Sequence, residues 1–190
     1  GSNDGTIYGA AWTKGKFGGA LSFNGVDNYV RISRPIENDF SISLWFKANG
    51  NNAAGEAANL GNGIVWSDVI ALQNDMIPMA ILNGKLAFGT GPEYPGTLFS
   101  NSLVDNNQWI HAVVTRVKST GEKKIYINGA LETSQIAGRQ SLNSNSIMDI
   151  GGNTLDKKFF KGLIEDVRIY DYALSSEEVA AIYKSETKNK

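Results

Sequence analysis

The sequence predicts an all-β domain in which two antiparallel sheets pack as a sandwich. Short apolar runs, about ten in number, recur along the chain with turn-forming residues between them. Glycine is abundant, at 21 of 190 residues, and proline occurs four times, which suits many tight turns between strands. One segment alone, near the C-terminus, has a convincing helical pattern.

The first strands follow from short apolar runs and alternating patterns. In the N-terminal half, such runs lie at residues 20–23, 28–32, 40–47, 63–72, 77–82 and 85–89. The run 40–47 alternates strictly, which predicts a strand with one core-facing side. The pair Asn83–Gly84 predicts a two-residue hairpin turn between the last two runs.

The C-terminal half continues the series and ends in the helix. Its strand-like runs lie at residues 109–117, 124–128, 131–133, 146–151 and 162–170. Asn128–Gly129 predicts a second hairpin turn. Ser175 and Glu178 form a capping box, and apolar residues from Val179 onward share one helical stripe.

Two segments, 49–62 and 90–107, are predicted to be long loops, and loops of that length in a compact domain are usually functional. We interpret residues 1–190 as one domain, in which Gly1 and Ser2 are a cloning scar and residues 185–190 form a frayed tail.

Composition excludes several classes of function. The formal net charge of −1 argues against a nucleic-acid or anionic-membrane surface. Cysteine is absent and histidine occurs once, which excludes disulfides, thiol chemistry and His-rich metal sites. No apolar run approaches the length of a membrane span. We therefore expect no nucleic-acid partner and no membrane insertion, and we also expect the isolated domain to be a monomer.

Four segments together resemble the laminin-G-like and concanavalin-A-like jelly-roll lectins, a group that includes pentraxin-type domains. The segments are residues 9–30, residues 40–47, residues 109–114 with 125–129, and residues 162–170 with 173–175. The resemblance implies a jelly roll with ligand sites on its concave face or loop rim. It also implies an extracellular or cell-surface location within a larger bacterial protein. It implies no single function, because this fold carries lectins, adhesion modules and some enzymes.

Oxygen-rich side chains suggest a structural calcium site, which many members of this group possess. The candidate ligands are Asn24, Asp27, Glu165 and Asp166. Calcium takes 6–8 oxygen ligands in flexible geometry. Glu165 departs from the group, which usually has Asp there, and this changes the reach of the carboxylate. The alternative is an Asx-turn at residues 24–27 and a salt bridge from Asp166 to a basic side chain.

A carbohydrate platform is the second candidate site. Trp66 follows the polar loop 49–62 and could stack against a sugar ring, with Asp68 supplying hydrogen bonds and Tyr94 of the second loop as a further contact. Core packing is the alternative for Trp66. The other three tryptophans fall inside the resembling segments, where we expect packing: Trp12, Trp45 and Trp109.

Catalysis has little support in the sequence. The related glucanases carry a Glu-x-Asp-x-x-Glu strand, and neither that cluster, a nucleophile elbow nor a P-loop occurs here. We interpret His111 as a framework residue, hydrogen-bonded between strands. The sequence therefore predicts a non-catalytic module that binds a glycan or polysaccharide. The alternatives are a protein-binding adhesion or spacer module and, third, a glycosidase or polysaccharide lyase.

Overall fold

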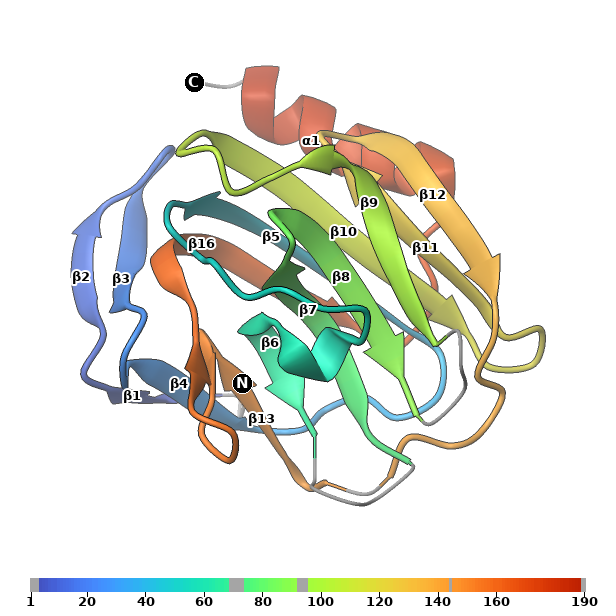
Figure 1. Ribbon diagram of the computed structural model, residues 1–190. Helices are drawn as coiled ribbons and strands as arrows, with labels where there is room; N and C mark the ends of the chain where they lie inside the picture. Colours follow the sequence, from blue (N-terminus) through green and yellow to red (C-terminus); the bar gives the residue numbers. More distant parts are fainter. Residues whose placement is uncertain (1–3, 69–73, 92–95, 144, 189–190) are drawn as a thin grey trace.

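The computed structural model describes residues 4–68, 74–91, 96–143 and 145–188. Two sheets pack face to face, and the helix α1 (Ser176–Lys188) lies against the outside of one of them (Figure 1). This arrangement confirms the predicted jelly-roll sandwich with its single α-helix near the C-terminus.

Sheet A contains the strands at the front of Figure 1. In spatial order they are β1 (Thr6–Tyr8), β4 (Tyr29–Ser33), β13 (Ile147–Ile150), β6 (Asn62–Ser67), β7 (Met76–Leu82), β8 (Lys85–Thr90) and β9 (Thr97–Leu103). The small hairpin of β14 (Gly152–Asn153) and β15 (Lys158–Phe159) joins this sheet through a parallel pairing of β15 with β6. The strands β1 and β9 form the opposite edges of this order.

Sheet B lies behind sheet A. Its spatial order is β12 (Ala130–Ile136), β11 (Glu122–Ile127), β10 (Trp109–Val117), β5 (Phe40–Ala48), β16 (Lys161–Tyr170), β3 (Gly19–Asn24) and β2 (Ala11–Lys14). The two sheets are linked along one margin, where the Glu132 carboxylate of β12 accepts hydrogen bonds from the main-chain N–H groups of Asn101 and Ser102 in β9, both at 2.9 Å. The Ser102 hydroxyl donates a third bond at 2.8 Å.

The alternation in residues 40–47 produces the predicted core face of β5. Phe40, Ile42, Leu44 and Phe46 are fully buried between the sheets. The opposite face of β5 is also buried, because α1 packs over it and stacks Tyr183 on Trp45 with ring centroids 5.7 Å apart. Burial of both faces therefore reflects the position of the helix.

Both Asn-Gly pairs form the predicted hairpin turns. Asn83 and Gly84 have φ angles of 54° and 71° between the paired residues at the ends of β7 and β8. Asn128 and Gly129, at 52° and 80°, join β11 and β12 in the same way. Left-handed φ at both central residues is the requirement of a type I′ turn, which Asn-Gly meets at low cost.

Some boundaries differ from the prediction. The strand β9 lies inside segment 90–107, which the sequence predicts to be a long loop, and both β1 and β2 precede the first predicted strand. The helix continues through Lys188 and so includes residues 185–188 of the predicted tail, whose fraying stays a prediction. Glu186 gives the reason that the helix continues, because its carboxylate accepts a 2.7 Å hydrogen bond from Nε1 of Trp45.

Candidate functional site

The outer face of sheet A, which points away from sheet B, carries a row of cross-strand neighbours. Asp149 pairs with Arg31 on one side and with Trp66 on the other, so the three side chains share a face. Trp66 in turn belongs to a cluster outside the main core that also includes Phe99. The segment 49–61, with the short 3₁₀ helix η1 (Ala58–Leu60), crosses this face in front of the sheet (Figure 1).

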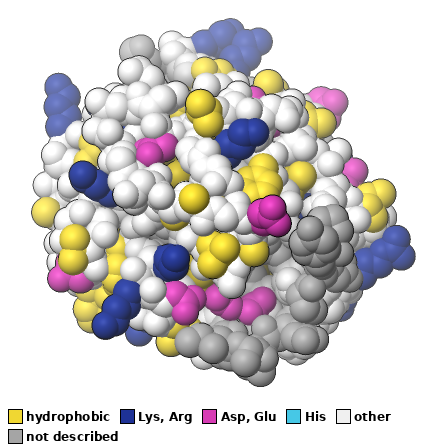
Figure 2. All heavy atoms as spheres, in the orientation of Figure 1, with side chains coloured by type: hydrophobic (Ala, Val, Ile, Leu, Met, Phe, Trp, Pro, Cys, Tyr) yellow, Lys and Arg dark blue, Asp and Glu magenta, His cyan; other side chains and the backbone are white. Residues whose placement is uncertain are grey.

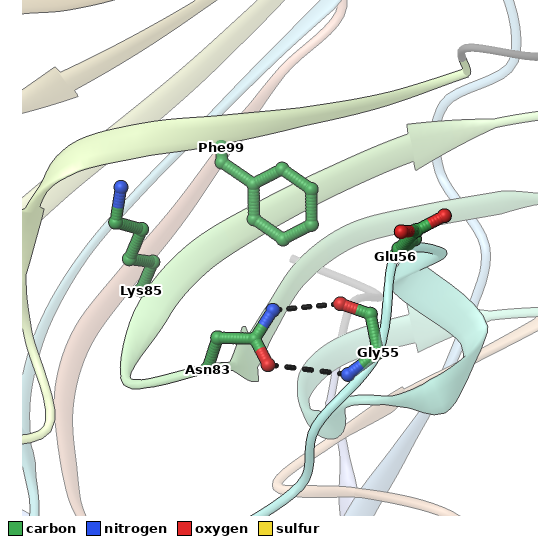
Figure 3. Close-up of a pocket in the computed structure, with 5 residues that line it drawn as sticks. All are labelled: Gly55, Glu56, Asn83, Lys85 and Phe99. Carbon is green, nitrogen blue, oxygen red and sulfur yellow. Dashed lines mark hydrogen bonds between the residues drawn. The ribbon is translucent and has the colours of Figure 1, made fainter.

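Segment 49–61 is fixed to the sheet by side-chain and main-chain hydrogen bonds. The Asn83 amide donates to the Gly55 carbonyl at 2.6 Å and accepts from its N–H at 3.2 Å (Figure 3). The Ala58 N–H donates to Oγ1 of Thr97 at 2.9 Å. Gly55 has φ of 149°, and a Cβ there would lie 2.5 Å from Leu60, so glycine suits this position. The segment therefore forms a fixed rim.

A pocket of about 370 Å³ lies between this rim and the β7–β8 turn. Its lining residues are Gly55, Glu56, Asn83, Lys85 and Phe99, and we name it the Phe99 pocket. Figure 3 shows the Phe99 ring between Lys85 on one side and the Gly55–Glu56 segment on the other. The volume falls within the usual range for small-ligand sites, about 300–1,000 Å³.

The pocket combines an aromatic ring with unused polar groups. The Asn83 side-chain amide is already hydrogen-bonded to Gly55 of the rim. In contrast, no described residue pairs with the Lys85 ammonium or the Glu56 carboxylate. An ammonium donates and a carboxylate accepts, so hydroxyl groups of a ligand could meet both kinds of partner. Figure 2 shows charges of both signs scattered over this side of the molecule, without a large area of one sign.

The predicted carbohydrate residues do not gather at this pocket. Trp66 is 3% exposed, and its indole N–H has no hydrogen-bond partner within the described ranges. The expectation of an open stacking surface at Trp66 is therefore wrong, because neighbouring side chains cover the ring. Asp68 is buried just after β6 and does not line the pocket. Tyr94 lies outside the described residues.

The predicted calcium residues fall into two separate groups. Asn24 and Asp27 form an Asx-turn, in which the Asn24 side chain accepts from the Val26 N–H and donates to Asp27. Asn24 of β3 pairs with Lys161 of β16. Glu165 lies four residues after Lys161 on β16, which is about 13 Å along the strand. The four residues therefore do not fit one calcium ion.

Glu165 and Asp166 have other partners. The Glu165 carboxylate accepts the main-chain N–H groups of Lys16 and Phe17, at 2.6 and 3.1 Å. Asp166 forms a salt bridge with Arg168, 2.6 Å between Oδ2 and Nη2. In the described part of the chain, no three acidic or histidine side chains form a metal-binding group. Calcium binding stays a prediction, with residues 24–28 as its remaining candidate.

His111 and Ser43 superficially resemble a nucleophile and base pair. Nε2 of His111 lies 2.9 Å from Oγ of Ser43 on the neighbouring strand, which confirms the predicted bond between strands. Glu186 approaches the same nitrogen at 3.8 Å, whereas a catalytic triad needs its acid on the other nitrogen. Burial lowers the pKa of His111 to about 4, and the ring is 1% exposed. The group is therefore structural.

Trp12 departs from the expected packing. It lies on the edge strand β2 with 71% of its surface exposed, whereas Trp45 is buried as expected. Trp109 is partly buried at the start of β10. The pocket residues Phe99, Lys85 and Glu56 are not among the predicted binding residues, since only the Asn-Gly turn and the polar loop hint that these segments meet.

The comparisons with known proteins agree with this architecture. The family model of the concanavalin A-like lectin/glucanases superfamily matches residues 24–180. Adhesion G-protein coupled receptor V1 of Danio rerio is 23% identical over 154 residues, 79% of this chain and 2% of that receptor. The present chain thus spans a small part of that relative's length. The part that the structure describes contains no helix long and apolar enough to cross a membrane.

Solved structures share the fold at low identity. Domain 4 of AbnA, a GH43 extracellular arabinanase from Geobacillus stearothermophilus, was solved in complex with arabinotriose. It has a TM-score of 0.73 and 22% identity, covering 94% of this chain and 87% of that one. The binding domain of Paraclostridial Mosquitocidal Protein 1 has a TM-score of 0.73 and 18% identity, and the match covers 98% of this chain and 48% of that one. The binding domain of Botulinum Neurotoxin DC, in complex with SialylT, has a TM-score of 0.69 and 17% identity, and the match covers 97% of this chain and 46% of that one.

These likenesses show the fold alone, whereas the family model covers most of the sequence. The chain belongs to the concanavalin A-like lectin/glucanases superfamily.

Proposed function

We propose that this domain is a non-catalytic carbohydrate-binding module of a larger secreted or surface-anchored bacterial protein. The observation that carries the proposal is the Phe99 pocket, in which an aromatic ring lies between the Lys85 ammonium and the Glu56 carboxylate, neither of which pairs with a residue that the structure describes. The apolar face of a sugar ring would stack on Phe99, and its hydroxyls would bond to Lys85 and Glu56.

The fixed rim favours binding, because a site that is already ordered loses little conformational entropy when a ligand arrives. Segment 49–61 is held by Asn83, by Thr97 and by Asn51, whose main-chain N–H donates to Asp105 at 2.8 Å. The arabinotriose complex of the AbnA domain and the SialylT complex of the toxin domain supply independent support, since both are glycan complexes on this fold.

We also propose that the domain does not itself hydrolyse glycosides. Glycoside hydrolysis in most families needs two carboxyl groups that flank the scissile bond. Glu56 is the single carboxylate among the residues that line the Phe99 pocket. The buried Ser43–His111 pair lies on the far sheet under α1 and cannot meet a substrate as it stands.

The test is a glycan array followed by calorimetric titration of the strongest glycan. Phe99→Ala should weaken binding about tenfold or more, because stacking contributes about 1 kcal/mol beyond area burial. Lys85→Met keeps the length of the side chain and removes the donor, so it should also weaken binding. The matched controls are Tyr172→Ala, since Tyr172 is 45% exposed, and Lys184→Met on the exposed side of α1.

The controls separate a local effect from general damage. Melting curves should show each variant folded at the titration temperature. Wild-type affinity in both pocket variants would place the binding site elsewhere, and a full array without a glycan ligand would contradict the carbohydrate proposal.

A protein-binding adhesion module is the second candidate, and exposed Trp12 favours it. An edge strand with a 71% exposed tryptophan offers both main-chain groups and an apolar contact to a partner. The similarity to an adhesion receptor points the same way. Trp12→Ala should abolish binding to a protein partner and leave glycan binding unchanged, whereas glycan-only binding would remove this candidate.

A further inference from the structure

A second aromatic surface lies at the opposite edge of the same sheet face. Tyr8 of β1 and Tyr29 of β4 are direct cross-strand partners, and their rings stack with centroids 4.5 Å apart and planes at 12°. We name this pair the tyrosine stack. Tyr8 remains 42% exposed, so the outer side of the stack is open to solvent.

The Tyr29 ring of the tyrosine stack contacts a guanidinium that is itself held in place by hydrogen bonds. The Arg31 guanidinium lies 5.1 Å from the centre of the Tyr29 ring. Arg31 is itself fixed by two bonds to the buried carboxylate of Asp149, at 2.7 and 2.8 Å, and by a 2.9 Å bond to Oγ1 of Thr154. A rigid exposed ring binds a flat apolar partner at low entropic cost.

The polar groups of the stack are available to a ligand. Neither tyrosine hydroxyl has a hydrogen-bond partner within the described ranges, and a phenol can donate and accept. A ring face bordered by free hydroxyls has the same chemistry as the Phe99 pocket, namely an apolar plane with hydrogen-bonding groups beside it.

The stack and the pocket share one face. Tyr29 lies two residues from Arg31 on β4, so both point to the outer side, and Arg31 is in register with Asp149 and Trp66. Six strand spacings separate β1 from β9, which places Tyr8 and Phe99 about 29 Å apart across the sheet. A monosaccharide therefore cannot reach both.

We infer that the ligand is an extended glycan chain that crosses the outer side of sheet A over segment 49–61 and contacts both the Phe99 pocket and the tyrosine stack. This inference rests on the proposed function and specifies its substrate class. Two weak contacts joined by one chain give an affinity well above that of either alone, provided that the chain spans both.

The test is titration of linear arabinose, glucose and galactose oligosaccharides, from trisaccharides to decasaccharides, into the wild-type domain and its variants. We expect wild-type affinity to rise steeply with chain length. Tyr8→Ala should weaken decasaccharide binding about tenfold and leave trisaccharide binding within about twofold, whereas Phe99→Ala should weaken both. Tyr8→Leu retains an apolar contact with Tyr29, guards against misfolding and should behave like Tyr8→Ala.

Tyr172→Ala is the matched control, because its exposure of 45% is close to that of Tyr8, and it should bind like the wild type. If both Tyr8 variants bind the decasaccharide with wild-type affinity while Phe99→Ala binds it more weakly, this inference is overturned and the proposed function stays intact. Loss in the Tyr8 variants alone, for trisaccharides as well, would move the site to the stack and overturn the two-contact arrangement. No binding to any of the oligosaccharides would overturn both proposals.

Discussion

The single histidine of the chain should make the domain sensitive to mild acid. His111 is buried between β5, β10 and α1, and its ring packs 5.1 Å from that of Trp45. Burial, and after it the charge of Arg168, lower the pKa of the imidazole to about 4, while Asp166 acts in the opposite direction. The ring is therefore neutral in the folded domain at pH 7, and acid favours the unfolded chain, where it can take up a proton.

The difference between the folded-state and unfolded-state pKa of His111 makes the free energy of unfolding depend on pH. A folded-state pKa near 4 and an ordinary value of 6.5 mean that the unfolded chain binds the proton more tightly. The stability contribution is complete above pH 6.5 and is lost as the pH falls toward 4, by about 3 kcal/mol in all. Burial raises the pKa of the facing Glu186, whose protonation in the folded state offsets part of this loss.

Urea denaturation of the wild type and of His111→Gln, between pH 7 and pH 4, measures the contribution. Glutamine keeps an amide that can bond to Ser43 and does not titrate in this range. The wild type should lose up to about 3 kcal/mol more than the variant. Proton NMR of the single imidazole should show no titration above pH 5. A folded-state midpoint near 6.5, or equal pH dependence of the two proteins, would refute the reasoning.

Three further predictions concern stability. Glu132→Ala removes the acceptor of three hydrogen bonds from β9 and should lower the free energy of unfolding, measured by urea denaturation, by roughly 1–3 kcal/mol. Glu122 forms a surface ion pair with a lysine, so Glu122→Ala should lower the free energy of unfolding by less than about 1 kcal/mol. Trp66→Ala should cost about 3–5 kcal/mol because the ring is buried, and Trp12→Ala should stay within about 0.5 kcal/mol. If residues 24–28 hold calcium, EDTA should lower the melting temperature and Asp27→Ala should abolish that difference; an unchanged melting temperature with EDTA would show that this segment is only an Asx-turn.

Local pattern was sufficient to predict the central strands and failed at the edges. The run 40–47 alternates strictly, and the Asn-Gly pairs favour the backbone conformation of hairpin turns. The strand and the turns can therefore be predicted from a single sequence. The strands β1 and β2 are exposed along their whole lengths and β9 is exposed at its C-terminal end. Edge strands with little burial carry a weak hydrophobic pattern, which is why the sequence predicts a loop where β9 forms.

The position of a side chain on a strand does not reveal what covers it. Alternation places Trp66 on the outer face of β6 but says nothing of the neighbours that bury it. The same limit applied to Trp12, which lies in a resembling segment and is nevertheless exposed. For Asn24 and Glu165, the deciding fact was the register of β3 against β16, which depends on long-range pairing.

The two outer sheet faces differ in how far their polar groups are already satisfied. On sheet B, α1 and the segments beside it use these groups: Ser41 accepts from the Leu174 N–H, Trp45 donates to Glu186, and Glu165 accepts from the N–H groups of residues 16 and 17. On sheet A, the Lys85 ammonium and the Glu56 carboxylate face a pocket without partners in the described part of the chain. A ligand gains most where polar groups are exposed yet fixed, since it replaces only water there. For that reason we assign recognition to sheet A and support of the fold to the helix-covered sheet B.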